Sequence, residues 1–180
     1  MQHRVAALSL AAAAAIALAA CGSDNNTSPP VSKIITVTTS MTPAGEPATT
    51  GNPTGNGTFT ATLDTSTGVF TWSGTFTGLT GNATLGHIHG PFPNGAATSA
   101  GVLINFDPAS TPGATFVGLK SASSGTFTGT INLASTAPQF VASISNDSLK
   151  KLILNNALYV NIHTAQNPAG EIRGQFTRKP

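Results

Sequence analysis

Apolar and polar residues alternate through most of the chain beyond residue 31, in short runs that Gly, Pro and Asn separate. A two-residue period is typical of strands with one buried face, and in several runs Thr fills the exposed parity. The pattern therefore predicts an all-β fold, a single antiparallel β-sandwich. We expect strands at Lys33–Thr39, Thr58–Leu63, Val69–Thr77, Ala83–His89, Val102–Phe106, Phe116–Leu119 and Thr126–Leu133, and a hairpin over Tyr159–Phe176.

One segment departs from the strand pattern. Asp147–Leu154, with the sequence DSLKKLIL, lies between capping residues, with Asn146 or Asp147 at its start and Asn155-Asn156 after it. We expect one short helix that connects two strands.

The N-terminus has the features of a targeting segment. After His3 and Arg4, an uncharged Ala- and Leu-rich run extends to Ala20, and it is shorter than the roughly 20 apolar residues of a membrane-spanning helix. The tetrapeptide Leu-Ala-Ala-Cys ending at Cys21 is similar to the lipobox of bacterial lipoproteins, whose cysteine is lipidated and becomes the mature N-terminus. An ordinary signal peptide with an incidental cysteine is the alternative, although Cys21 is the only cysteine of the chain.

These features predict the domain organisation. We expect a lipoprotein signal peptide at 1–20, a lipidated cysteine and polar tether at 21–31, and one domain at 32–178, which is long enough for a single core. Lipid on Cys21 would attach the protein to a membrane of the bacterial cell envelope. Gly22 after the cysteine is typical of lipoproteins of the outer membrane or cell surface.

The composition of the chain limits the classes of partner and the cellular location that we expect. Charged residues make up only 8% of the chain, against roughly 25% in an average soluble domain. The formal net charge of +2 includes Arg4 of the expected signal, so no basic patch suggests a nucleic-acid partner. A Thr-, Ser-, Gly- and Asn-rich composition indicates an extracytoplasmic β-protein.

The motif GHIHGP carries the first candidate chemistry. On a strand, His87 and His89 project from one face while Ile88 projects from the other. Neutral imidazole is a common ligand of zinc and copper, and His163 from the later hairpin would supply a third nitrogen. Strand histidines also occur exposed and without a metal, so both interpretations stay open.

The hairpin YVNIHTAQNPAGEIRGQF adds further polar candidates. Its apolar parity predicts that Asn161 pairs with Arg173 and His163 with Glu171, all on the outward face. Glu171 is a fourth candidate metal ligand, although it could instead orient an imidazole or pair with Arg173. Tyr159, Asn161 and Arg173 would lie next to this site.

Four stretches together resemble the CHRD domain, first described in chordin: GEPATTGNPTGNGTFTATLDTSTGVFTW, GHIHGP, AGVLINF and LYVNIHTAQNPAGEIRGQF. The resemblance covers about Lys33 to Phe176. It implies a β-sandwich domain, of the immunoglobulin-like or superoxide dismutase-like type. The molecular function of the family is largely undefined, so the resemblance identifies the domain more than its activity.

A more distant similarity links the chain to Cu/Zn superoxide dismutase. By that analogy His87, His89 and His163 would match copper ligands. No histidine remains for a metal bridge, no zinc-ligand cluster is visible, and one cysteine cannot form the structural disulfide. The analogy therefore carries over only a metal pocket.

Three functions follow from the sequence. The first is a lipid-anchored extracytoplasmic binding module for a protein or a small ligand, with a copper or zinc site. The second is a metal-dependent redox enzyme of the superoxide dismutase type, and the third is a structural surface domain whose histidines only form hydrogen bonds. We favour binding over catalysis because the sequence lacks a nucleophile elbow, a phosphate loop and a second carboxylate near Glu171.

Overall fold

A computed structural model describes residues 34–92, 99–133 and 145–180, which fall within one unit, Val31–Pro180. The expected signal peptide and tether at 1–31, and residues 93–98, lie outside the described residues. The elements are β1 (Ile34–Met41), η1 (Pro43–Gly45), β2 (Asn56–Asp64), β3 (Val69–Thr77), β4 (Ala83–His89), β5 (Val102–Asn105), β6 (Thr115–Val117), β7 (Gly125–Asn132), α1 (Asn146–Leu154), β8 (Tyr159–Thr164), β9 (Ile172–Gln175) and β10 (Thr177–Arg178).

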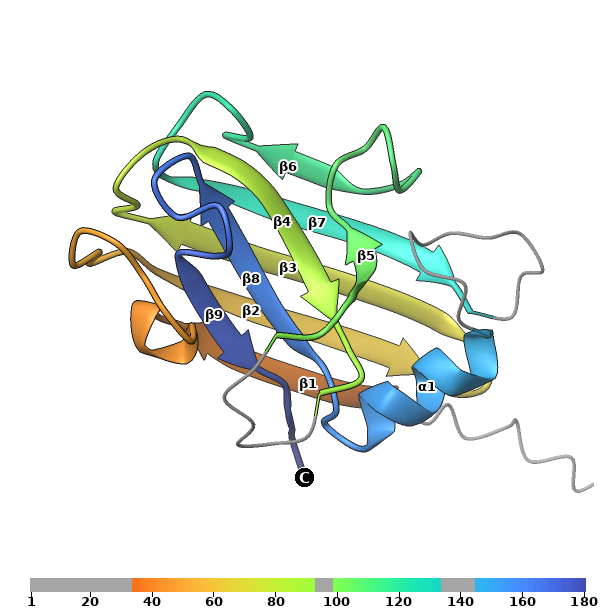
Figure 1. Ribbon diagram of the computed structural model, residues 1–180. Coiled ribbons are helices and arrows are strands. Elements are labelled where there is room, and N and C mark those ends of the chain that lie inside the picture. The colour runs from red at the N-terminus through yellow and green to blue at the C-terminus, as the bar shows by residue number, and fades with distance from the viewer. Residues whose placement is uncertain (1–33, 93–98, 134–144) are drawn as a thin grey trace, which may run out of the picture. The chain divides into compact units, whose positions relative to one another are not determined.

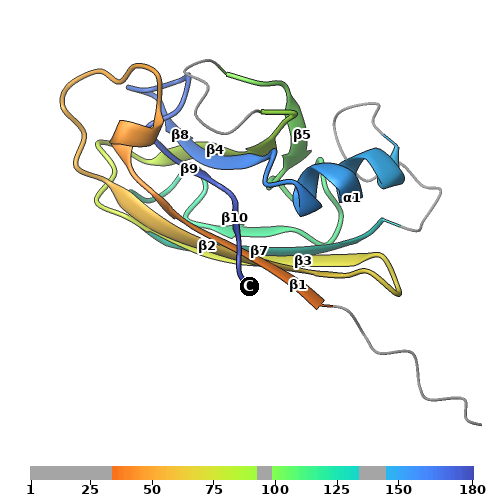
Figure 2. The same cartoon turned by 90° about the horizontal axis from the view of Figure 1, so that it is seen from below.

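These strands form two layers, as Figures 1 and 2 show. The six-stranded sheet has the order β10-β1-β2-β3-β7-β6, and the four-stranded sheet has the order β5-β4-β8-β9. Neighbouring strands are antiparallel throughout both sheets. The predicted antiparallel β-sandwich is confirmed.

The predicted strands are all present, with differences at their ends. The strand expected at Phe116–Leu119 is β6 and stops at Val117, because Gly118 and Lys120 adopt positive φ angles of 95° and 62° and turn the chain. Neither η1 nor β10 was predicted, since two or three residues are too short to show a period.

The expected helix is α1, which lies at one end of the sandwich (Figures 1 and 2). Its N-cap is Ser145, whose side chain accepts a hydrogen bond from Ser148 N at 3.2 Å, so the prediction of Asn146 or Asp147 as the cap was wrong. Leu149 and Ile153, four residues apart, are fully buried against the core. Among the described residues, no helix is long and apolar enough to cross a membrane.

The core between the sheets contains large side chains that lie over glycines of the next strand. Trp72 pairs with Gly129, and a Cβ atom on Gly129 would collide with the indole ring. The same arrangement occurs with the strands exchanged: the Phe127 ring of β7 lies over Gly74 of β3. Residues from both sheets are buried in this one cluster, among them Phe70, Trp72, Val160, Ile162, Ile172 and Phe176.

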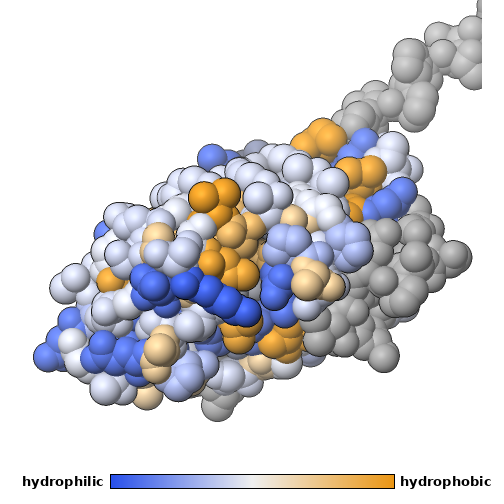
Figure 3. Space-filling view, turned by 90° about the horizontal axis from the view of Figure 1, so that it is seen from above, coloured by the Kyte–Doolittle hydropathy of each residue, from blue (hydrophilic) through white to orange (hydrophobic). Residues whose placement is uncertain are grey.

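The outer face of the six-stranded sheet carries hydroxyl groups. Thr58 and Thr75 share a hydrogen bond of 2.9 Å, and Thr71 and Thr130 one of 3.1 Å, across neighbouring strands. This is the exposed parity that the alternation predicts. On the side of the molecule in Figure 3, polar side chains interrupt the apolar areas.

Candidate metal centre

Strands β4 and β8 are neighbours in the four-stranded sheet and bring the three histidines together. His87 and His89 project from the face opposite to Ile88, which is in the core. Leu85, on that same outer face, pairs with His163, so the third ring lies beside the other two. One ligand nitrogen from each histidine lies within 4.8 Å of the others.

Backbone carbonyls fix the orientation of two rings. His89 Nδ1 donates to Ala100 O at 2.8 Å, and His163 Nδ1 donates to Pro168 O at 3.0 Å. A carbonyl oxygen can only accept, so each Nδ1 carries the ring hydrogen and each Nε2 of the neutral ring carries a lone pair. His87 Nδ1 lies 3.0 Å from His163 Nε2, which completes a group of three nitrogens.

Asn161 lies between these rings. Its Oδ1 is 3.0 Å from His89 Nε2 and 3.0 Å from His163 Nε2. Its Nδ2 donates to Glu46 Oε1 at 3.2 Å. The sequence placed Asn161 next to the site but missed Glu46, because no local pattern links two residues that are 115 positions apart.

The site is covered, although its residues were expected on an outward, exposed face. Each of the three histidines is only 6% exposed. Burial lowers the pKa of His87 to about 3, and the neighbouring His163 and His89 rings add to that shift. Burial also lowers the pKa values of His89 and His163, despite opposing hydrogen bonds to Ala100 and Pro168. The imidazoles are therefore neutral near pH 7, the state that binds metals.

Two predicted neighbours form a stack at one side of the histidines. The Tyr159 ring lies parallel to the His89 ring, and the Arg173 guanidinium carbon lies 3.5 Å from the centre of the Tyr159 ring. Phe92 also contacts Arg173, at 4.2 Å from its ring centre. Asn161 pairs with Arg173 across β8 and β9, as predicted. The stack covers His89 with aromatic and cationic groups.

Glu171 lies in a different network. Its carboxylate accepts hydrogen bonds from Thr80 N at 2.7 Å, Thr80 Oγ1 at 2.5 Å, Thr164 Oγ1 at 2.6 Å and Asn167 Nδ2 at 3.3 Å. Burial by itself would raise the pKa of this carboxyl, but the hydrogen bonds from Thr164, Thr80 and Asn167 outweigh it and lower the pKa. Of the four predicted metal ligands, the structure brings the histidines together and places Glu171 outside their group.

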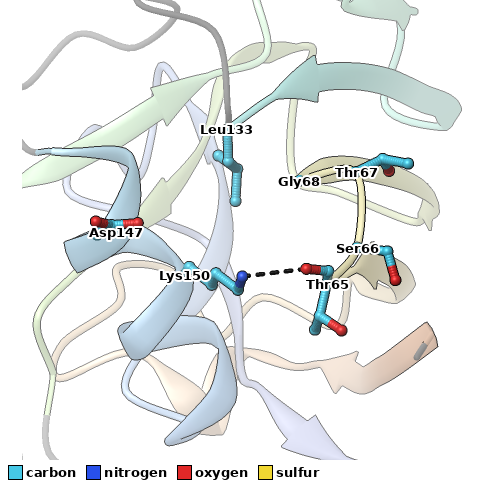
Figure 4. A pocket seen from close by; sticks show the side chains of 7 residues that line it. All are labelled: Thr65, Ser66, Thr67, Gly68, Leu133, Asp147 and Lys150. Atoms are coloured by element: carbon cyan, nitrogen blue, oxygen red, sulfur yellow. Dashed lines mark hydrogen bonds between the residues drawn. The ribbon is translucent and has the colours of Figure 1, made fainter. Parts of the chain in front are cut away.

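A small pocket lies away from the histidine group, between the β2–β3 turn and α1 (Figure 4). Its volume is about 110 Å³, and Lys150 Nζ donates across it to Thr65 O at 3.2 Å. The lining residues are Thr65, Ser66, Thr67, Gly68, Leu133, Asp147 and Lys150. No histidine of the group lines this pocket, so we place the candidate site on the four-stranded sheet.

Comparison with known proteins supports the domain assignment. The family model described as the CHRD domain matches residues 37–176. Searches of curated proteins and of solved structures find no significant match. The matched region runs from β1 to the end of the hairpin and includes every residue of the histidine group. The chain belongs to the CHRD domain family.

Proposed function

We propose that this CHRD domain is a binding module that holds a copper or zinc ion on His87, His89 and His163. The observation that carries the proposal is the convergence of three neutral ring nitrogens in a buried site. Imidazole is a common ligand of both metals. The carbonyls of Ala100 and Pro168 supply the outer hydrogen bonds that metal-binding histidines usually make.

A purely structural role for the histidines explains less of the geometry. In that arrangement His87 Nδ1 donates to His163 Nε2, but His89 Nε2 still faces Asn161 Oδ1 at 3.0 Å. Both of these atoms are acceptors, and two buried acceptors in contact are unfavourable. A metal ion bound by both atoms would use their two lone pairs and remove the conflict, which supports a metal site.

The cellular setting is part of the proposal. The sequence before Cys21 supports lipid attachment in the bacterial cell envelope, at the outer membrane or cell surface. There the domain would bind an extracytoplasmic protein or a small ligand. The binding role is the function that we propose first, and the redox enzyme is the alternative.

Metal titration tests this proposal. Full-length protein in detergent, freed of metal with a chelator, is titrated with Cu(II) and with Zn(II), and we expect one ion per chain. His87→Ala and His163→Ala should each lose most of the affinity, whereas Leu85→Ala, on the same strand face but without a ligand atom, should bind as the wild type does. Wild-type metal affinity in both histidine variants would reject the metal site and leave a purely structural role for the histidines. Rapid superoxide turnover by the copper-loaded protein would favour the redox enzyme.

A further inference from the structure

The geometry points to Asn161 as the fourth metal ligand and to Glu46 as the positioning residue that aims the Asn161 amide. This inference rests on the proposed metal site and completes it. It replaces Glu171, the carboxylate expected from the sequence, by an amide oxygen in the middle of the histidine group.

Distances and burial support Asn161 as a ligand. The side chain is 1% exposed, and its Oδ1 lies 3.0 Å from two of the three candidate nitrogens. In a tetrahedral zinc site with bonds of about 2.0 to 2.1 Å, neighbouring ligand atoms lie roughly 3.3 Å apart. The two Asn161 contacts are a few tenths of an ångström shorter than this separation, so the amide oxygen lies where a fourth ligand is needed beside His89 and His163. The three histidine nitrogens, within 4.8 Å of one another, would draw closer together around an ion.

Glu46 determines which end of the amide faces the histidines. Its Oε1 accepts the hydrogen bond from Asn161 Nδ2, so the amide oxygen is directed to the opposite side, toward His89 and His163. Glu46 is itself buried. A hydrogen bond of this kind, from an outer residue to a metal ligand, commonly changes metal affinity by about 10- to 100-fold.

The fold makes room for Glu46 at this position. Thr42 and Arg173 exchange two backbone hydrogen bonds, of 3.1 and 3.0 Å, which fasten η1 to β9. Gly170, at a φ of 134°, leaves the space that the carboxylate occupies, because a Cβ atom there would collide with Glu46 Oε1 and lie 2.9 Å from Asn161 Nδ2. Two segments distant in sequence thus meet around one carboxylate.

Four protein ligands would close the coordination sphere. Structural zinc sites have four protein ligands, whereas catalytic sites keep one position for water or substrate. A site closed by Asn161 therefore fits a binding module, and it predicts that small anions do not reach the ion in the wild-type protein.

Azide and Co(II) test the inference directly. We expect the visible spectrum of the Co(II)-loaded wild-type protein to be unchanged by azide, and that of Asn161→Ala to change as azide takes the opened position. Glu46→Gln should lower Zn(II) affinity by about 10- to 100-fold in the wild type, but it should have little further effect in the Asn161→Ala background, because Glu46 acts through Asn161.

Two results would overturn the inference while leaving the three-histidine site intact. One is an azide response in the wild-type protein, which needs no variant and so does not depend on whether Asn161→Ala folds. The other is an equal affinity loss from Glu46→Gln in both backgrounds, with far-UV spectra confirming that the variants are folded. Failure of the wild type to bind Cu(II), Zn(II) or Co(II) at all would instead reject the proposed function.

Discussion

The Tyr159 ring lies flat against the His89 imidazole, with ring centres 4.6 Å apart and planes 5° from parallel. The backbone of Ala100 connects the two side chains at their edges. Its N–H donates to the Tyr159 hydroxyl at 3.1 Å, and its carbonyl accepts from His89 Nδ1 at 2.8 Å. Tyr159 therefore contacts the ring face of His89 and also binds the backbone of Ala100, the residue whose carbonyl orients that ring.

Tyr159 variants should separate these two contributions. Tyr159→Phe keeps the stacked ring but leaves the Ala100 N–H without its partner, and should lower the free energy of unfolding by about 1 to 3 kcal/mol. Tyr159→Ala also removes the ring, and should cost about 3 to 5 kcal/mol and weaken metal binding. Urea unfolding of the metal-free protein measures both values. Equal losses in the two variants would show that the stack contributes nothing.

Gly129→Ala should destabilise the core. The new methyl group would enter the Trp72 indole, and overpacking of this kind costs about 1 to 3 kcal/mol. Gly81→Ala is the matched control, because nothing lies within 4 Å of a Cβ atom at that position. Trp72 is the only tryptophan, so its fluorescence reports unfolding in both variants. An unchanged free energy of unfolding in Gly129→Ala would contradict the packing of Trp72 on Gly129.

The metal-free protein should lose stability in acid. His87 has a folded pKa of about 3, against 6.5 for an ordinary histidine. Between these pH values the unfolded chain binds a proton that the folded protein does not, so the free energy of unfolding falls as the pH drops, by up to about 1.4 kcal/mol per pH unit for each such histidine. Denaturant unfolding between pH 7 and 4 measures the slope.

The neighbouring carboxyl groups modify this profile. Burial raises the pKa of Glu46, so the free energy of unfolding that this group contributes decreases as the pH rises above about 4.5. The pKa of Glu171 is lowered, so the contribution of that group decreases as the pH falls below about 4.5. His87→Ala should show a shallower slope than the wild type between pH 6.5 and 4.5. An unchanged slope in that variant would mean that His87 titrates normally.

Glu171→Gln should affect stability and leave metal binding intact. The substitution replaces a buried acceptor of four hydrogen bonds with an amide that also carries donors, which should cost more than about 2 kcal/mol. Because Glu171 lies outside the histidine group, Zn(II) affinity should stay within a few-fold of the wild type. A loss of affinity without a loss of stability would restore Glu171 as a ligand.

Cys21→Ser tests the membrane anchor. Wild-type protein should fractionate with membranes and carry lipid on Cys21, because a lipoprotein anchor supplies the several acyl chains that stable attachment needs. The variant should keep its unprocessed mass and lack the lipid. Recovery of wild type and variant at the same mass and in the same fraction would reject the anchor.

The sequence predicted the parts of the site that follow from strand period and missed those that depend on tertiary contacts. Parity placed His87 with His89 on one face of β4, and Asn161 with His163 on one face of β8. The two pairs meet because β4 and β8 are neighbours in the sheet. Glu46 reaches the site only through η1, a turn without periodicity. The outward face was expected to be exposed because alternation shows which side chains share a face, but not whether a loop covers that face.

The distance in sequence between the paired histidines has a consequence for the whole domain. His87 and His163 are 76 residues apart, and an ion on both would close a loop of that length. A closed loop of this length lowers the entropy of the unfolded chain. In the chain-entropy treatment of disulfides, this stabilises the folded protein by about 4 kcal/mol. A chain with a single cysteine cannot form that link with sulfur. The ion would therefore act as a removable cross-link, and taking the metal away would lower the stability of the whole domain and not only of the site.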